Sequence, residues 1–323
     1  MKHKISFLMA AHNEEKIIEK ALEKLIKFHE DYPDMEVLIG LDGCTDNTLS
    51  IVKRFSQKNK FLKYFELNER NGKQAILEKL EPHIKGDIVI IHDADWSFVY
   101  NSKKDLIEYI SLFDNPKIGG IADSISSEFC RDDFKEINSI GFLASAWGNH
   151  FLIDYIKKKF TEKKYNYYVY DIKKMKFFPF LDVYRREAMK KTRHKEELRA
   201  GDHVERTLRI INAGYDVIAF DNPNWPHFMV NYNKQSIKDL INQKVRGIVA
   251  KKKIQSSYNV KIPFFGFYVP FLSYVVLNSF KVKRLRDFAA IYTYLFVMFY
   301  SIILAKIKQR ASVKEIWSLR IKR

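Results

Sequence analysis

Short apolar runs alternate with helix-like segments through the first hundred residues, and this alternation limits the possible folds more than any other feature. Strand-forming runs occupy residues 5–10, 36–42, 63–67 and 87–93. The first segment between them carries apolar residues at helical spacing, namely Ile17, Ile18, Ala21, Leu22 and Leu25. Strands separated by helices at this interval form a mostly parallel sheet with helices on both faces. The sequence therefore predicts an α/β fold with a Rossmann-like sheet.

Turn and cap signals support the same alternation. Asn13 is predicted to cap the first helix, and the turn residues DGCTDNT at 42–48 precede the second. Residues 199–220 indicate a loop, a helix closed by Gly214 and a further strand. Because no internal repeat or low-complexity linker interrupts residues 1–230, we expect one domain there.

Composition excludes several classes of protein. With 323 residues, 46% of them hydrophobic, the chain can bury a full core and is not expected to be disordered. Cys44 and Cys130 are its only cysteines and lack CxxC spacing, which argues against a disulfide framework or a zinc site and favours the cytosol. The basic start and short apolar run end at His12 without a cleavage site, so a first strand is expected rather than a signal peptide.

Positive charge is concentrated in the tail. Residues 231–323 hold 19 Lys and Arg against three acids, which accounts for +16 of the net charge of +17. These basic residues interleave with two apolar runs, 262–280 and 288–305. Basic clusters beside aromatic-rich apolar segments suit the anionic face of a membrane better than a nucleic-acid groove, and no nucleic-acid module signature is present. We expect a membrane partner and no nucleic acid.

The arrangement of the tail argues against a simple transmembrane hairpin. Pro263, Gly266 and Pro270 break the first run, whereas the second is uncharged and about long enough to span a bilayer. Basic residues flank both runs and separate them, so a hairpin would place one basic loop on the wrong side. Re-entrant or in-plane helices are favoured, with spanning left open. The predicted regions are a catalytic domain at 1–230, an amphipathic basic connector at 231–259 and membrane-associated helices at 260–323.

Polar clusters follow four of the predicted strands. They are Ala10–Glu14, Asp42–Asp46, Asn71–Lys73, and Asp93 with Asp95. The carboxyl ends of parallel strands meet at one sheet edge, where such folds bind ligands. Any one cluster could consist of solvated turn residues, but four at one edge indicate a site.

This pattern resembles the family 2 glycosyltransferases, which have the GT-A fold, over roughly the first 230 residues. AAHNEE stands for the family's P-x-x-N-E-E opening and LDGCTDNT for its D-D-G-S-T-D-x-T. NGKQAIL stands for its Gly-Lys loop and HDADW for its metal-binding D-x-D. The resemblance implies use of a nucleotide-sugar donor, a UDP- or GDP-sugar, and does not identify the sugar.

A divalent cation is expected because the leaving nucleoside diphosphate is strongly anionic. Mg²⁺ or Mn²⁺ prefers oxygen ligands, so one or two carboxylates and the phosphates complete its shell. The resemblance assigns Asp95 to the metal and Asp93 to ribose or a metal-bound water. We expect an extended segment, in which the i, i+2 spacing points both carboxylates to the same side.

The resemblance assigns further donor contacts. Asp42 matches the aspartate that binds the base, while Leu41 replaces the other member of that pair. Ala10, His12 and Glu14 lie in the opening motif, with Ala10 and His12 at nucleotide contacts, and Lys73 lies where a basic residue approaches the diphosphate. A turn histidine and a solvated lysine are the structural alternatives for His12 and Lys73.

The acceptor side departs from the family pattern. The family's Glu-Asp pair, whose Asp is the general base, aligns with Asp202 and His203; a one-residue shift makes Asp202 the base, which we prefer to His203. Glu205 is a second catalytic candidate or a solvated helix carboxylate. Gln243 and Arg246 resemble the family's Q-x-x-R-W, but Gly247 replaces its tryptophan, which weakens the case for a processive synthase. Arg246 is expected to bind the donor diphosphate or an acceptor phosphate bidentately.

Together these features predict an inverting, metal-dependent glycosyltransferase that acts on a lipid-linked or glycan acceptor at the cytoplasmic membrane face. The alternatives are a processive polysaccharide synthase, a sugar-nucleotide pyrophosphorylase and a non-catalytic membrane-associated nucleotide-sugar-binding protein. The pyrophosphorylase would need a glycine-rich loop where this chain has AHNEE. An ionised lipid phosphate needs no general base, so the displaced Glu-Asp pair also suits a phosphate acceptor.

Overall fold

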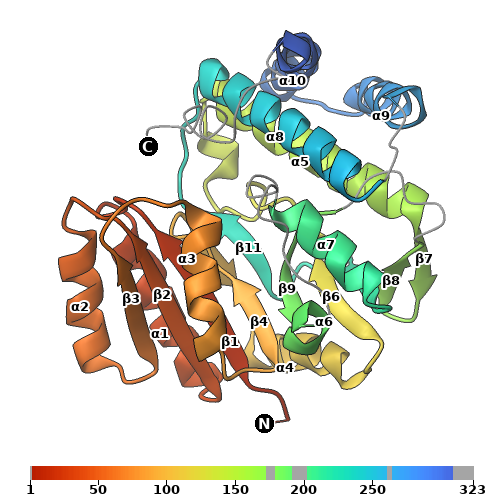
Figure 1. Ribbon diagram of the computed structural model, residues 1–323. Helices are drawn as coiled ribbons and strands as arrows, with labels where there is room; N and C mark the ends of the chain where they lie inside the picture. The colour runs from red at the N-terminus through yellow and green to blue at the C-terminus, as the bar shows by residue number, and fades with distance from the viewer. Residues whose placement is uncertain (1, 172–178, 191–201, 260–263, 308–323) are drawn as a thin grey trace. The chain divides into compact units, whose positions relative to one another are not determined.

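The computed structural model describes residues 2–171, 179–190, 202–259 and 264–307 (Figure 1). These residues form two compact units. The first comprises Met1–Asp123, Leu181–Arg193 and Arg209–Tyr232, and the second comprises Ser124–Phe180, His194–Leu208 and Asn233–Arg323.

The first unit is an α/β unit built on a mostly parallel sheet. Its strands are β1 (Ile5–Ala11), β2 (Met35–Asp42), β3 (Leu62–Leu67), β4 (Ile88–Ile91), β5 (Trp96–Val99), β6 (Ile118–Ala122), β9 (Leu181–Arg185), β10 (Asp216–Phe220) and β11 (His227–Val230). Its helices are α1 (Ile18–Asp31), α2 (Thr48–Lys58), α3 (Lys73–Leu80), α4 (Lys103–Ser111) and α6 (Arg186–Lys190), with short 3₁₀ turns η1 (Glu81–His83) and η2 (Leu112–Asp114).

The strands of this unit's main sheet run in the order β3-β2-β1-β4-β9-β6-β10. Only β9 is antiparallel to its neighbours β4 and β6, and the other pairings are parallel. β5 and β11 form a separate antiparallel pair. The predicted α/β class and mostly parallel sheet are confirmed.

Helices cover this sheet because its strands are apolar on both faces. All eight residues of β2 are buried, and α1 buries the face that carries Ile18, Leu22 and Leu25. α3 packs on β1 and β2 (Figure 1), and a Cβ placed on Gly40 would lie 2.2 Å from the Ile76 side chain. The glycine within β2 therefore lets α3 approach the strand closely.

The predicted helix boundaries were partly wrong. Asn13 does not cap α1, which begins at Ile18; the Ile17 and Ile18 amides donate to the Glu14 carbonyl. Asn13 instead has a φ of 55° and bonds to Thr45. Tertiary contact between two loops has thus replaced a local cap. The predicted closing glycine, Gly214, is confirmed with a φ of 86°.

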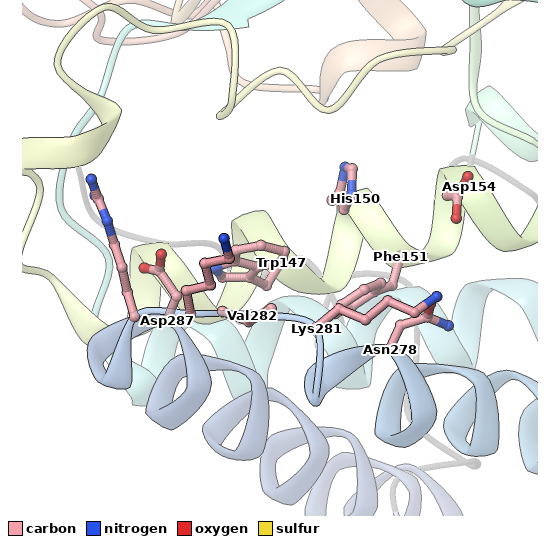
Figure 2. A pocket seen from close by; sticks show the side chains of 10 residues that line it. Trp147, His150, Phe151, Asp154, Asn278, Lys281, Val282 and Asp287 are labelled. Carbon is pink, nitrogen blue, oxygen red and sulfur yellow. The ribbon is translucent and has the colours of Figure 1, made fainter.

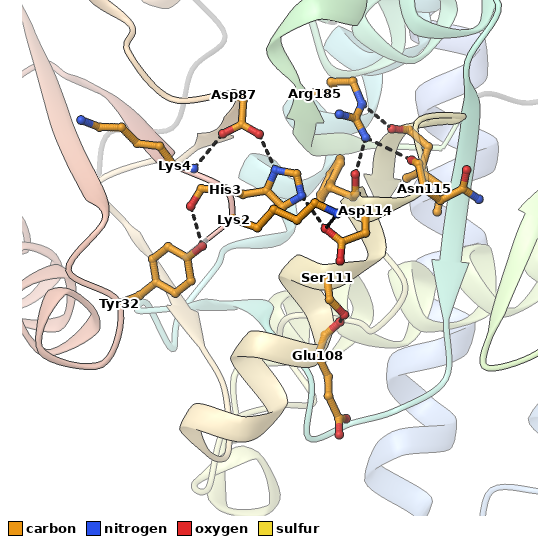
Figure 3. A network of polar contacts seen from close by, with 12 residues as sticks. Lys2, His3, Lys4, Tyr32, Asp87, Glu108, Ser111, Asp114, Asn115 and Arg185 are labelled. Carbon is orange, nitrogen blue, oxygen red and sulfur yellow. Dashed lines mark hydrogen bonds and ion pairs between the residues drawn. The ribbon is translucent and has the colours of Figure 1, made fainter.

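A polar network joins the amino-terminal edge of the sheet (Figure 3). The His3 ring bonds to Asp87 before β4 and lies 2.9 Å from the Asp114 carboxylate in η2. The Tyr32 hydroxyl donates to the His3 carbonyl at 2.6 Å. Arg185, at the end of β9, donates to the Phe113 carbonyl at 2.6 Å. The network links strands that are distant in sequence at the amino-terminal edge of the parallel strands, which is also where the antiparallel strand β9 ends.

The second unit is mainly helical. Its elements are η3 (Phe134–Glu136), α5 (Ile140–Phe160), β7 (Thr161–Lys164), β8 (Tyr167–Tyr170), α8 (Ile237–Ser257), α9 (Phe264–Ser279) and α10 (Leu285–Ile307), and α7 (Asp202–Asn212) begins here and ends in the first unit. α10 packs on α5 and α8 through one face, which runs from Asp287 to Ala305. Helices α9 and α10 cover 264–279 and 285–307, so the described parts of both apolar runs are mainly helical.

The opposite faces of α9 and α10 are unusually apolar. Eleven of the fourteen large hydrophobic side chains that are exposed among the described residues lie between Val269 and Ile307. Within those same residues, α10 is the single helix with the length and hydropathy needed to cross a membrane. Its buried face, however, is committed to protein contacts along the whole helix.

Candidate functional site

The carboxyl ends of β1, β2, β3 and β4 meet at one edge of the sheet. The register pairs Ala10 with Gly40 and Asp42 with Leu67, and the His92 amide donates to Leu8 of β1. The polar clusters that follow these strands are therefore neighbours, which is the arrangement that the sequence predicts. Ala10, His12 and Glu14 are all partly exposed at this edge.

Hydrogen bonds join the loop after β1 to the loop after β2. The Nδ1 of His12 lies 2.6 Å from the Asp42 carbonyl oxygen, so Nδ1 carries the proton and donates. The Glu14 amide donates to Thr48 Oγ1 at 2.8 Å. The His12 ring therefore joins the two loops, and its predicted contact to the nucleotide stays a prediction.

The Asp42 carboxylate orders the segment that leads into α3. Its two oxygens accept the amides of Asn71 and Gly72 at 2.7 and 2.8 Å, and Asp42 is only 3% exposed. Gly43 has a φ of 62°, and a Cβ there would lie 2.5 Å from the Arg70 nitrogen. Each oxygen of the Asp42 carboxylate has a further lone pair that could accept a hydrogen bond from the nucleotide base. This contact stays a prediction.

Lys73 and Asp93 form an ion pair between the third and fourth clusters. Lys73 Nζ lies 2.7 Å from Asp93 Oδ1, and only 15% of the lysine side chain is exposed. The alternative of a solvated surface lysine is wrong. The pair places a cation directly beside the first aspartate of the D-x-D motif.

The D-x-D motif is a turn, and the expected extended segment is wrong. β4 ends at Ile91, and the Trp96 amide donates to the Asp93 carbonyl at 3.1 Å. Strand alternation therefore does not fix the directions of the two carboxylates. Asp95 is 7% exposed, and its carbonyl accepts the Asn231 amide at 2.8 Å. β5 begins directly after this turn, and Asn231, which bonds to it, directly follows β11. The antiparallel pair β5–β11 therefore fixes the position of the turn.

The residues present fit a hard divalent cation. Asp93 and Asp95 supply carboxylate oxygens, which Mg²⁺ and Mn²⁺ prefer, and Asp95 is held with little exposure. Within the described part of the chain, no group of three or more His, Cys, Asp or Glu is arranged to hold a metal. Such an ion would thus need ligands from the diphosphate as well as from these carboxylates.

His92 is a neighbour of this site that sequence analysis missed. It is fully buried against Phe7 and Phe228, and neither ring nitrogen has a hydrogen-bond partner among the described residues. Burial lowers the pKa of His92 to about 4, so the ring is neutral and adds no positive charge beside Asp93. Its position just before the two aspartates was the available signal.

The predicted acceptor residues lie in the second unit. α7 begins at Asp202, whose side chain lies outside the described residues. Glu205 is 1% exposed, and its Oε1 accepts the Tyr258 hydroxyl at 2.9 Å, so the alternative of a solvated helix carboxylate is wrong. Arg246 is half-buried on α8.

Two lysines of α8, spaced by two helical turns, were also missed. Burial lowers the pKa of Lys244 to about 8. The pKa of Lys251 is lowered to about 7, mainly by burial and to a smaller extent by the charge of Lys244. Asn149 joins Lys244 to Glu128 by bonds of 3.4 and 2.8 Å. The seven-residue spacing in KVRGIVAK was the signal, because it places both lysines on one helix face.

Known proteins match both the sequence and the fold. The model of the family "Glycosyl transferase family 2" matches residues 6–192. The chain is 28% identical over 287 residues to a dolichyl N-acetyl-alpha-D-glucosaminyl phosphate 3-beta-D-2,3-diacetamido-2,3-dideoxy-beta-D-glucuronosyltransferase of Methanococcus voltae, across 84% of this chain and 81% of that protein. It is 24% identical over 223 residues to the probable glycosyltransferase YdaM of Bacillus subtilis, across 67% of this chain and 49% of that protein.

A solved structure extends the comparison to the fold. The mannosyltransferase PcManGT from Pyrobaculum calidifontis, in complex with GDP-Man and Mn²⁺, superposes with a TM-score of 0.60 at 18% identity, over 96% of this chain and 88% of that one. The expected GT-A fold is confirmed.

Proposed function

The chain belongs to glycosyl transferase family 2, and we propose that this glycosyltransferase moves a sugar, with inversion, from a UDP- or GDP-sugar to a lipid-linked or glycan acceptor at the cytoplasmic membrane face. The observation that carries the donor half is the connected series Asp42, the loop 71–72, Lys73 and Asp93 at the carboxyl edge of the sheet. Through direct contacts, this series connects Asp42, which is proposed to bind the nucleotide base, to Lys73 and Asp93, which are proposed to lie near the diphosphate.

Each member of that series has a role in donor binding. Asp42 fixes the backbone before α3, which holds Lys73 in position to meet the diphosphate oxygens by a charge-assisted hydrogen bond. His12 offers Nε2 toward the nucleotide because Nδ1 is committed to Asp42. Ala10 and Glu14 border the same loop. These contacts orient the anomeric carbon for in-line attack.

Asp95 and Asp93 would hold the divalent cation. When bound, the ion neutralises the charge that develops on the leaving diphosphate. Lys73 balances Asp93 in its absence, since two carboxylates so close in sequence otherwise repel one another. The complex of PcManGT with GDP-Man and Mn²⁺ supports this assignment by similarity of fold.

The acceptor half combines a candidate base with cationic side chains. Asp202 is proposed to deprotonate an acceptor hydroxyl, while Glu205, bonded to Tyr258, positions the start of α7. Arg246 on α8 is proposed to bind an acceptor that carries phosphate. Such an acceptor would favour the charged forms of Lys244 and Lys251, whose pKa values burial lowers. The M. voltae relative, named for a dolichyl-phosphate-linked substrate, supports a lipid-linked acceptor.

The test is donor binding with and without Mn²⁺, followed by transfer. Wild-type protein should bind one UDP- or GDP-sugar more tightly with Mn²⁺, and Asp95→Asn should lose that enhancement together with transfer while melting normally. Glu23→Gln, which removes an exposed carboxylate from α1, is the control and should behave as wild type. Full Mn²⁺-dependent binding by Asp95→Asn would reject the metal assignment.

A further inference from the structure

A pocket of about 400 Å³ lies in the second unit, between α5 and the connection that joins α9 to α10 (Figure 2). Trp147, His150, Phe151 and Asp154 line it from α5, and Asn278, residues 281–284 and Asp287 line it from the other side. None of these residues belongs to the donor or acceptor assignments above.

The two acids of the pocket are already neutralised by cations that do not line it. Arg286 donates to Asp287 Oδ1 from Nε and Nη2 at 2.9 and 2.8 Å. Lys158 Nζ lies 2.8 Å from Asp154 Oδ2, and the Tyr274 hydroxyl bonds to the same oxygen. The acids therefore offer little attraction to a further cation.

The positive charge of the pocket is left unbalanced. Lys281 donates to Asn278 Oδ1 at 2.9 Å, and this amide oxygen does not cancel its charge. The exposed side chains of Lys283 and Arg284 have no hydrogen-bond or ion-pair partner within the described ranges. The indole N–H of Trp147 is likewise buried without a partner there. The three cations are groups that a phosphate binds.

Apolar side chains flank the same three cations. Leu277, Phe280 and Leu285 are 68%, 70% and 83% exposed, and they lie just before and just after the basic residues in the chain. The apolar surface continues along the outer face of α10 through Phe296 and Phe299. A water-soluble phosphate would use the cations and leave this surface in water, whereas an amphiphilic phosphate would cover it.

We propose that this pocket binds the phosphate headgroup of an anionic membrane phospholipid, whose acyl chains lie on Leu277, Phe280 and Leu285. α10 then rests with one face on α5 and α8 and the other against lipid, in the plane of the membrane. The site holds the enzyme on anionic membranes independently of donor and acceptor.

The experiment measures co-sedimentation of the full chain with phosphatidylcholine vesicles that contain or lack phosphatidylglycerol. The double variant Lys283→Gln/Arg284→Gln should bind the anionic vesicles roughly tenfold or more weakly, since each basic residue near such a surface contributes on the order of 1 kcal/mol.

The matched control is Lys163→Gln/Lys164→Gln, which removes two exposed charges from β7 in the same unit. It should bind almost as wild type. An equal loss in the control would mean that overall charge, and not this pocket, attracts the membrane. Millimolar inorganic phosphate that raised the melting temperature of wild type but not of the pocket variant would show a site for free phosphate and overturn the lipid assignment. Mn²⁺-dependent donor binding should be unchanged in every variant, so this test and that of the glycosyltransferase function fail separately.

Discussion

At the scale of single residues, Lys73 and Asp93 show how the site holds negative charge before a donor arrives. Their ion pair, 2.7 Å long and with little of the lysine exposed, keeps one D-x-D carboxylate compensated. Burying an unpaired carboxylate is costly, and removing one partner exposes the other to that cost. Lys73 therefore compensates the charge of Asp93 in this structure.

Lys73→Met should weaken nucleotide-sugar binding by roughly ten- to a hundredfold, which corresponds to the loss of a hydrogen bond between charged groups. Lys73→Arg should recover part of that affinity. Calorimetric titration checks both, with Lys58→Met on the exposed end of α2 as the control. Unchanged affinity in Lys73→Met would remove the lysine from the donor site.

Lys251 should make stability depend on pH. Its folded pKa is about 7, below the ordinary value near 10.5, so between these values the unfolded chain binds one more proton than the folded one. Stability should rise with pH across that window. Lys251→Met should therefore melt above wild type at pH 7, and the difference should shrink toward pH 10.

Thermal melts of both proteins at several pH values measure this difference. Lys238→Met, which removes an exposed lysine from the first turn of α8, should show no such trend. A constant difference between Lys251→Met and wild type would mean that burial does not depress this pKa.

At the scale of elements, two helix glycines of the second unit differ in their surroundings. A Cβ on Gly148 of α5 would lie 2.1 Å from the Tyr294 ring of α10, whereas a Cβ on Gly247 of α8 would meet nothing within 4 Å. Gly148 is thus required for α10 to pack on α5. A side chain at Gly247 of α8 would meet open space.

Gly247→Ala should stabilise the protein by roughly 0.5–1 kcal/mol, the helix-propensity difference, because nothing obstructs the methyl group. Gly148→Ala should destabilise it, since the Tyr294 ring must move. Denaturant titration of both variants tests the pair. Destabilisation by Gly247→Ala would mean that this position is not open as described.

At the scale of the whole molecule, the chemistry of the acceptor decides whether Asp202 or Arg246 contributes more to sugar transfer. If a phosphate oxygen attacks, Asp202→Asn should slow transfer only modestly and Arg246→Ala should raise the acceptor KM sharply. If a hydroxyl attacks, Asp202→Asn should lower kcat by roughly 10² to 10⁴, the usual contribution of general base catalysis. Initial rates at saturating donor distinguish the two acceptors.

The sequence by itself determined the sheet and the edge at which the candidate site residues gather. Apolar runs end at Ala10, Asp42 and Asp93, and parallel strands bring their carboxyl ends together, so neighbouring clusters follow from the order of elements alone. The family and the two apolar helices of the tail could also be predicted, since motif spacing and hydropathy are local properties.

Only the tertiary structure decided how the individual side chains are used. Asn13 bonds to Thr45 instead of capping α1, and Asp93 and Asp95 lie in a turn held by β5 and β11. Glu205 is buried under Tyr258, and the depressed pKa values of His92 and Lys251 arise from burial. Each outcome depends on partners far away in the chain. The hydrophobic periodicity of the sequence predicts the face of a helix or strand on which a residue lies. The hydrogen bonds and the desolvation of that residue depend on which parts of the chain pack against that face.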